Sequence, residues 1–487
     1  MYEHEQTGGG IPNMLTRFVD EIGLLTFYNS SLDTKLLCFQ RFVRLFAYGG
    51  CTLIFASFFE ALGIQRGRIG LFMTLTLIGD TVISLFLTLY ADRLGRRAIL
   101  GAGALLMTFS GIVFALSDNY FVLLAAAVLG VIAPSGNEIG PFRAIEESTL
   151  AHLNSPEKRS DIFAWYSLIG SAGVATGMMV SGWIIQSLQA HGWTTLESYK
   201  FTFYAYAGMG FLKFLFALSM SPQVEAETKR KSAQADETAP LLAQETEPPA
   251  LEEKWSWRSI LPQISRESTS ILIKLCLLFA IDSFASGLAP VTWQTFFFKT
   301  KFNLSEGVLG SIFFTTASIA SLSMLVSSSI AKRIGNIKAM VYTHLPSAIA
   351  LALVAIPDQL PIALTLLILR ACTQSMDTVP RSAFLAAVIL PGERTAIMGT
   401  VNVVKTCAQS LSPFLTGILA ERELFWLAFV LAGTLKAVYD ISILMVFLGH
   451  KPREEEVIIP GDTNEDSDSN TMEQNGVVSK PLSAPAA

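Results

Sequence analysis

Long runs of apolar residues alternate with short polar connections along most of this 487-residue chain. A helix that crosses the hydrocarbon core of a bilayer needs about 20 mostly apolar residues. Twelve runs come close to this length, and each predicts one membrane-spanning helix: 37–60, 69–90, 98–117, 120–147, 161–189, 201–220, 268–296, 305–330, 339–356, 360–390, 397–420 and 424–448. The pattern therefore predicts an all-α membrane protein with twelve transmembrane helices.

Polar stretches divide the twelve runs into two sets of six. The stretch between the sixth and seventh runs is rich in Glu, Ala, Pro, Gln and Lys, which is typical of segments that bury too little apolar surface to fold. The stretch after His450 has the same character. We predict a cytosolic N-terminal segment at 1–36, a six-helix bundle at 37–220, a disordered cytosolic linker at 221–266, a second six-helix bundle at 267–450 and a disordered cytosolic tail at 451–487.

Lysine and arginine gather in every second connection between the runs. Cytoplasmic loops carry an excess of these residues, so both termini are predicted to lie in the cytoplasm. The first such loop, Asp92-Arg93-Leu94-Gly95-Arg96-Arg97, has a partial copy in the second half of the chain, Lys332-Arg333-Ile334-Gly335-Asn336. Four cations on the outer side are exceptions to the rule: Arg66, Arg68, Lys299 and Lys301.

Further positions repeat between the two halves in the same register. Arg44 in the first run corresponds to Asp282 in the seventh, Glu138 in the fourth to Asp377 in the tenth, and Lys213 in the sixth to Lys436 in the twelfth. A register shared across two sets of six spans predicts two pseudo-symmetric six-helix bundles related by a parallel repeat.

These features resemble the major facilitator superfamily, whose usual signature between the second and third helices is Gly-x-x-x-Asp-Arg-x-Gly-Arg-Arg. This chain has Thr88 where the leading glycine usually stands. The resemblance implies that spans 1, 4, 7 and 10 line the central pathway, and that the loop is a cytoplasmic gate that latches helix ends when the transporter faces outward. The gate residues so implied are Asp92, Arg93, Gly95, Arg96 and Arg97, with Lys332, Arg333 and Gly335 in the second copy. The alternative is a basic loop that only sets the topology.

Two subfamily motifs are missing from the places where the resemblance would put them. Met220-Ser221-Pro222-Gln223 follows the sixth run in place of the Pro-Glu-Ser-Pro-Arg stretch of sugar porters. The fifth run has the glycines but not the proline of the drug:proton antiporter motif. Neither subfamily is therefore favoured.

Charged and polar side chains inside the predicted spans are the candidate transport residues. An ionisable group at the bilayer centre costs about 2.5–3.5 kcal/mol on insertion scales, so it usually faces a cavity or a partner. Helical spacing aligns these groups in stripes, for example at 41, 44 and 48 and at 370, 374, 377 and 381. The predicted substrate and proton pathway comprises Arg41, Arg44, Tyr48, Glu138, Arg143, Asp282, Arg370, Gln374, Asp377, Arg381, Lys405 and Gln409.

Arg44 and Asp282 occupy equivalent positions in helices that the resemblance places opposite one another. We therefore predict an ion pair between the halves, which protonation or substrate would weaken; the alternative is a permanent structural pair. Glu138 and Asp377 each precede a proline by three residues, and burial favours the neutral form of a carboxylic acid, which suits reversible protonation. Against this, Asp377 lies one helical turn from Arg381 and has a structural partner there. Lys213 and Lys436 are assigned no transport role; Asp440 is one turn from Lys436 and is its expected partner.

Composition excludes several other classes of protein. Apolar residues make up 51% of the chain and charged residues 15%, a balance typical of a membrane protein. The sequence has no basic tract for nucleic acid, no nucleotide-binding glycine loop, no catalytic dyad and no metal-type spacing among its five cysteines. We expect neither an enzyme nor a cofactor.

The sequence thus predicts a secondary transporter that moves a small solute by alternating access, coupled to protons, with an anionic or zwitterionic solute favoured. The alternatives are an efflux antiporter for neutral or cationic compounds and a non-transporting membrane sensor with the same fold. The expected partners are the solute, protons and the bilayer, with the protein as a monomer. The plasma membrane is favoured, and a vacuolar or endosomal membrane is the alternative because 237–242 has acidic dileucine spacing.

Overall fold

The computed structural model describes residues 23–130, 132, 141–225, 265–390 and 393–448. Regular structure in these ranges is helical. The first half contains α2 (Leu24–Tyr28), α3 (Leu32–Ala61), α4 (Arg66–Leu94), α5 (Arg96–Leu116), α6 (Tyr120–Gly130), α7 (Pro141–Leu153), α8 (Pro156–Ala190), α9 (Thr195–Ser219) and the short η1 (Pro222–Val224). The second half contains α12 (Arg266–Leu288), α13 (Val291–Phe302), α14 (Glu306–Ile334), α15 (Asn336–Leu353), α16 (Leu360–Thr373), α17 (Thr378–Val388), α18 (Arg394–Glu421) and α19 (Phe425–Phe447).

Each predicted span coincides with one helix or with two consecutive helices, so the prediction of an all-α membrane fold is confirmed. Eight helical segments of the described chain are long and apolar enough to cross a membrane by length and composition alone. The predicted tail, most of the predicted linker and Glu138 lie outside the described residues, whereas residues 23–36 of the predicted N-terminal segment are described and contain α2 and the start of α3.

Two spans of the described chain are each divided into two helices, and a proline lies at or beside each break. Pro290 has no amide hydrogen and stands in extended backbone, with a ψ of 162°, between α12 and α13. Pro380 lies in the first turn of α17, where its missing amide leaves the carbonyl of Met376 without a helical partner. The hydroxyl of Ser327 on α14 donates to that carbonyl. The carbonyl that Pro380 frees therefore has a protein partner in this structure.

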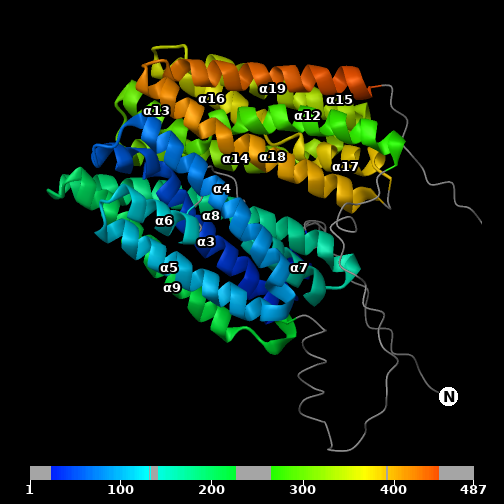
Figure 1. Ribbon diagram of the computed structural model, residues 1–487, viewed down its shortest axis with the longest axis horizontal. Helices are drawn as coiled ribbons and strands as arrows, with labels where there is room; N and C mark the ends of the chain where they lie inside the picture. Colours follow the sequence, from blue (N-terminus) through cyan, green and yellow to red (C-terminus); the bar gives the residue numbers. More distant parts are fainter. Residues whose placement is uncertain (1–22, 131, 133–140, 226–264, 391–392, 449–487) are drawn as a thin grey trace, which may run out of the picture. The chain divides into compact units, whose positions relative to one another are not determined.

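The two halves pack their helices in the same way. In the first half α3 contacts α8 and α9, and α5 contacts α9; in the second half α12 contacts α18 and α19, and α15 contacts α19. In Figure 1, α19 accordingly lies beside α12 and beside α15. These pairs join equivalent spans, so the sequence repeat is also a structural repeat of two six-helix bundles.

Hydrogen bonds between the halves, within the described residues, gather toward the helix ends opposite the basic loops. Trp183 on α8 donates to Ser311 on α14 at 2.9 Å, and the Tyr199 hydroxyl on α9 donates to Glu306 at 2.7 Å. The amide of Gly67 at the start of α4 donates to Glu421 at the end of α18. The outer side is thus the side on which the bundles are joined.

The outer cations that depart from the positive-inside rule contribute to this joined side. Lys299 binds Glu306 at 2.8 Å and also contacts Tyr199 of the other half. Arg66 binds Glu60 at 3.0 Å and donates to the carbonyl of Ala420 across the halves. Local structural contacts therefore account for these charges without reversing the predicted topology.

Replacing Gly310 with valine is expected to disfavour this closed outer side. A Cβ at Gly310 on α14 would lie 2.5 Å from the carbonyl oxygen of Met178 on α8, so the helices would have to separate. In a chain whose native cysteines are replaced, Met178→Cys should react several-fold faster with a membrane-impermeant maleimide added from outside. Gly208→Val is the matched control, because a Cβ there meets nothing within 4 Å. Equal labelling rates in the two variants would contradict the expectation.

Candidate functional site

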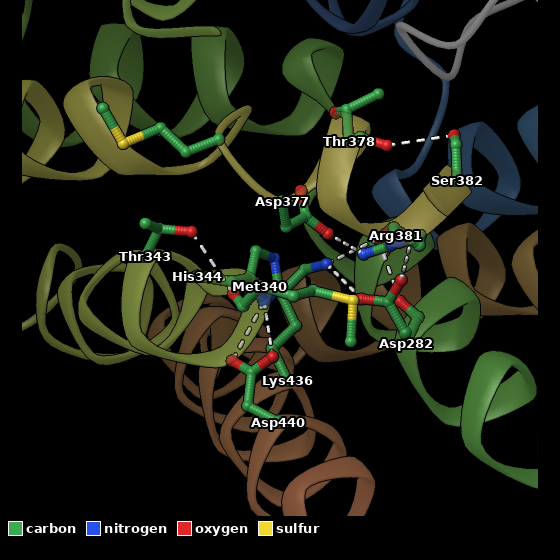
Figure 2. A network of polar contacts seen from close by, with 12 residues as sticks. Asp282, Met340, Thr343, His344, Asp377, Thr378, Arg381, Ser382, Lys436 and Asp440 are labelled. Atoms are coloured by element: carbon green, nitrogen blue, oxygen red, sulfur yellow. Dashed lines mark hydrogen bonds and ion pairs between the residues drawn. The ribbon is translucent and has the colours of Figure 1, made fainter. Parts of the chain in front are cut away.

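A network of buried charges joins three helices of the second half (Figure 2). Asp282 on α12 accepts a hydrogen bond from Lys436 on α19 at 2.7 Å and another from Arg381 on α17 at 3.1 Å. Arg381 also binds Asp377, the residue that precedes α17. Lys436 donates further to the Ser286 hydroxyl at 2.8 Å. We call Asp282, Asp377, Arg381 and Lys436 the C-half network; its formal charges sum to zero.

A second buried pair lies next to this network. His344 on α15 places Nδ1 2.9 Å from both carboxylate oxygens of Asp440 on α19. Asp440 therefore binds His344, whereas Lys436 binds Asp282 on another helix. The Lys436–Asp440 pair that the helical spacing allows is not formed, because Asp282 and His344 on neighbouring helices bind the two side chains instead.

The first half buries a corresponding network around a carboxylate that the sequence analysis did not select. Glu146 on α7 has no exposed surface; it binds Arg44 at 2.6 Å and Lys213 at 3.4 Å. The Tyr166 hydroxyl donates to it at 2.7 Å. Arg44 therefore pairs within its own bundle, and the predicted pair with Asp282 is not formed in this structure.

The two networks use similar elements of the two halves but not the same register throughout. The first span carries Arg44 in one half and Asp282 in the other; α7 carries Glu146 and α17 carries Arg381, which lie one helical turn apart when Pro141 is aligned with Pro380. The sixth span of each half adds a lysine, Lys213 or Lys436, that reaches the carboxylate. Both lysines were assigned no role, although their matched positions in the repeat were a signal for one.

A cavity of about 390 Å³ borders the C-half network. Residues from α12 to α16 and from α19 form most of its wall, and α8 adds Val174 and Met178. Its charged or titratable lining side chains are Arg370, Lys436 and His344, and no carboxylate belongs to the lining among the described residues. Gln374 lies on the same wall. The site therefore offers positive charge to a solute of moderate size.

The structure places the remaining candidate pathway residues around these features. Arg41 stacks on the Tyr166 ring with its guanidinium 4.0 Å from the ring centroid. Lys405 lies 5.5 Å from the centroid of Phe279, a ring that Arg381 also contacts. Arg143 is half exposed and binds Glu147 at 2.7 Å, away from the two networks. Tyr48 is partly buried and Gln409 buried, on α3 and α18 respectively.

The candidate gate has the turn that its glycines predict. Gly95 and Gly335 precede α5 and α15 with φ values of 96° and 86°, which residues with a Cβ rarely adopt. The amide of Arg96 donates to Glu225 at 2.8 Å, and the Arg97 guanidinium donates to the carbonyl of Leu218 at 3.0 Å. Lys332 and Arg333 are exposed in the last turn of α14, while the side chains of Asp92 and Arg93 lie outside the described part of the chain.

Comparison with known proteins extends these observations. A model of the Major Facilitator Superfamily matches residues 37–291 and 275–482. An uncharacterized membrane protein of Saccharomyces cerevisiae is 36% identical over 437 residues, which cover 87% of this chain and 96% of that protein. The structure of a D-xylose-proton symporter matches with a TM-score of 0.65 at 14% identity, covering 85% of this chain and 97% of its own. A mutant form of the nucleoside transporter NupG matches with a TM-score of 0.64 at 13% identity, covering 85% and 100%.

Proposed function

Because this chain belongs to the major facilitator superfamily and is a multi-pass membrane transporter rather than an enzyme, we propose that it moves a small anionic or zwitterionic solute by alternating access, driven by protons. The observation that carries this proposal is the position of Lys436, which lines the cavity and also binds Asp282 at 2.7 Å. One side chain thus contacts both the candidate proton acceptor and the space for the solute.

The charges of the C-half network suggest how proton and solute would be coupled. With Asp282 ionised, its charge and that of Asp377 balance Arg381 and Lys436. Protonation of Asp282 would leave one positive charge in excess and weaken the hold on Lys436. An anion in the cavity would offset this added positive charge, so each ligand would favour binding of the other. This sign of coupling corresponds to movement of proton and anion together.

Alternating access would then use the inter-bundle contacts described above. The joined outer side corresponds to the state open toward the basic loops, and separation of α8 from α14 would begin the opposite state. We assign the gate role to the Gly95 turn and its arginines, as the resemblance implies. The plasma membrane is the proposed location, with the protein as a monomer, and a vacuolar or endosomal membrane is the alternative.

Asp282→Asn is expected to abolish proton-coupled transport. The purified protein would be reconstituted in vesicles with a trapped pH dye, and solutes of each charge class would be added outside. Wild-type vesicles should show a solute-dependent change in internal pH, and Asp282→Asn should reduce its initial rate by at least about tenfold. Asp358→Asn is the matched control, because Asp358 is 95% exposed in an outer loop. Undiminished pH-driven flux in Asp282→Asn would refute the coupling.

A further inference from the structure

Arg370 differs from the other charged groups around the cavity. It lies in the last turn of α16, lines the cavity and donates to the side-chain oxygen of Gln294 at 3.2 Å. Within the described residues it makes no ion pair, whereas Lys436 is matched by Asp282 and His344 contacts Asp440. An arginine stays charged in a protein, and Arg370 is partly buried, where a charge without a counter-ion is costly. A negatively charged ligand would supply the missing counter-ion, so the site is suited to bind one.

Gln294 holds this arginine in position. Its side-chain amide donates to the carbonyl of Ala289 at 2.6 Å, beside the break between α12 and α13. This bond turns the side-chain oxygen of Gln294 toward Arg370, where it accepts one of the five guanidinium N–H groups. The remaining donors form a planar fork, which matches the two oxygens of a carboxylate.

The other residues of the cavity wall indicate the size and polarity of the uncharged part of the ligand, which we call its body. Apolar side chains of Val174, Met178, Phe313, Leu351 and Leu367 line the same cavity. A volume of about 390 Å³ equals that of roughly thirteen waters in the liquid, which suits a solute with a few carbon atoms or one ring. Because Lys436 is already matched by Asp282, one negative charge is sufficient to balance Arg370.

We propose that Arg370 is the anion-binding residue of the cavity and that the solute is a small organic monoanion, a carboxylate on an apolar body. The assignment rests on the proposed function, of which it specifies the substrate class. Gln294 is a positioning residue that acts through Arg370.

Binding to the purified full-length protein in detergent tests the proposal without any proton gradient. The probes are phenylacetate, phenylacetamide and phenethylamine, which share one body and differ in charge, with acetate and chloride as anions that lack the body. Ligand binding raises the melting temperature, so affinities follow from its concentration dependence. Phenylacetate should bind at least about tenfold more tightly than its amide, as expected for a charge-assisted hydrogen bond, and more tightly than acetate or chloride.

Substitutions locate the effect. Arg370→Gln should remove the preference of phenylacetate over its amide, and Arg370→Lys should keep only part of it, because an ammonium lacks the fork. Arg422→Gln is the matched control, since Arg422 is exposed at the end of α18. Gln374→Glu keeps Arg370 but places a carboxylate one helical turn away, so it should weaken anion binding even if Arg370→Gln fails to fold.

The outcomes separate this proposal from the proposed function. Equal binding of carboxylate and amide, or binding of the amine alone, overturns the monoanion assignment. A carboxylate preference that survives in Arg370→Gln overturns the role of Arg370. If the preference depends on Arg370 while vesicles show no proton-coupled flux, the assignment stands and proton coupling is wrong.

Discussion

Replacing Glu146 with glutamine is expected to destabilise the protein strongly, by roughly 3–5 kcal/mol, because it breaks a buried ion pair by removing one partner. Glu146 is fully buried and is the carboxylate that Arg44 and Lys213 both bind. Glutamine has almost the same shape, so the packing around α7 would change little. The loss would come from two buried cations that no longer face a negative charge. The measurement is the thermal unfolding midpoint of the purified protein in detergent.

The neighbouring residue supplies the control. Glu147 binds Arg143 one turn away on the same helix, but the two side chains are 33% and 48% exposed. Such exposed pairs contribute only about 0.3–0.5 kcal/mol, so Glu147→Gln should leave the midpoint nearly unchanged. Adding Lys213→Met to Glu146→Gln should recover part of the loss, since one of the unmatched cations is then gone. Equal midpoints for Glu146→Gln and Glu147→Gln would show that the first-half network does not stabilise the fold.

The sequence predicts the spans well because membrane insertion depends on composition over some twenty residues. Pro290 and Pro380 mark the two breaks that the structure describes within spans. A proline only removes a local hydrogen bond, and whether the helix then ends depends on tertiary partners such as Ser327, which binds the freed carbonyl. That partner is distant in the sequence.

Ion-pair partners were harder to predict than the charged residues themselves. The repeat places Arg44 and Asp282 at equivalent points of two bundles, but equivalence does not make two residues neighbours. Each instead pairs within its own bundle, because a helix of that bundle presents an opposite charge nearby. Lys436 comes within reach of Asp282 because α12 packs against α19 in the folded protein.

Glu146 shows where a closer reading of periodicity would have helped. It shares a helix face with Thr149, Leu150 and Leu153, all of which continue an inward-facing pattern. Glu147 lies on the opposite, polar face, where Arg143 is one turn away. The helical spacing thus distinguishes the buried acid from the exposed one.

The double variant Asp282→Asn with Lys436→Met is expected to be nearly as stable as wild type but to lack proton coupling. Asp282→Asn alone leaves Lys436 with the Ser286 hydroxyl in place of a carboxylate, at a cost of roughly 3–5 kcal/mol. Lys436→Met alone should cost less, because Arg381 remains 3.1 Å from Asp282. The double variant lacks both charges of the pair, and Arg381 keeps Asp377 as its partner. Its free energy of unfolding should therefore lie within about 1 kcal/mol of the wild-type value.

The same four proteins, measured in the vesicle assay, separate a structural pair from a transport pair. If the pair only fixes the packing of α12 against α19, the double variant should recover flux together with stability. If Asp282 carries the proton, the double variant should be stable and still fail to respond to a pH gradient. A double-mutant cycle on the outer pair of Lys301 and Asp358 is the matched control. The Lys301 ammonium lies 3.2 Å from the Asp358 carboxylate, and Asp358 is 95% exposed, so the coupling energy of this pair should be near zero. A stable double variant that transports protons as wild type does would leave Asp282 with a structural role alone.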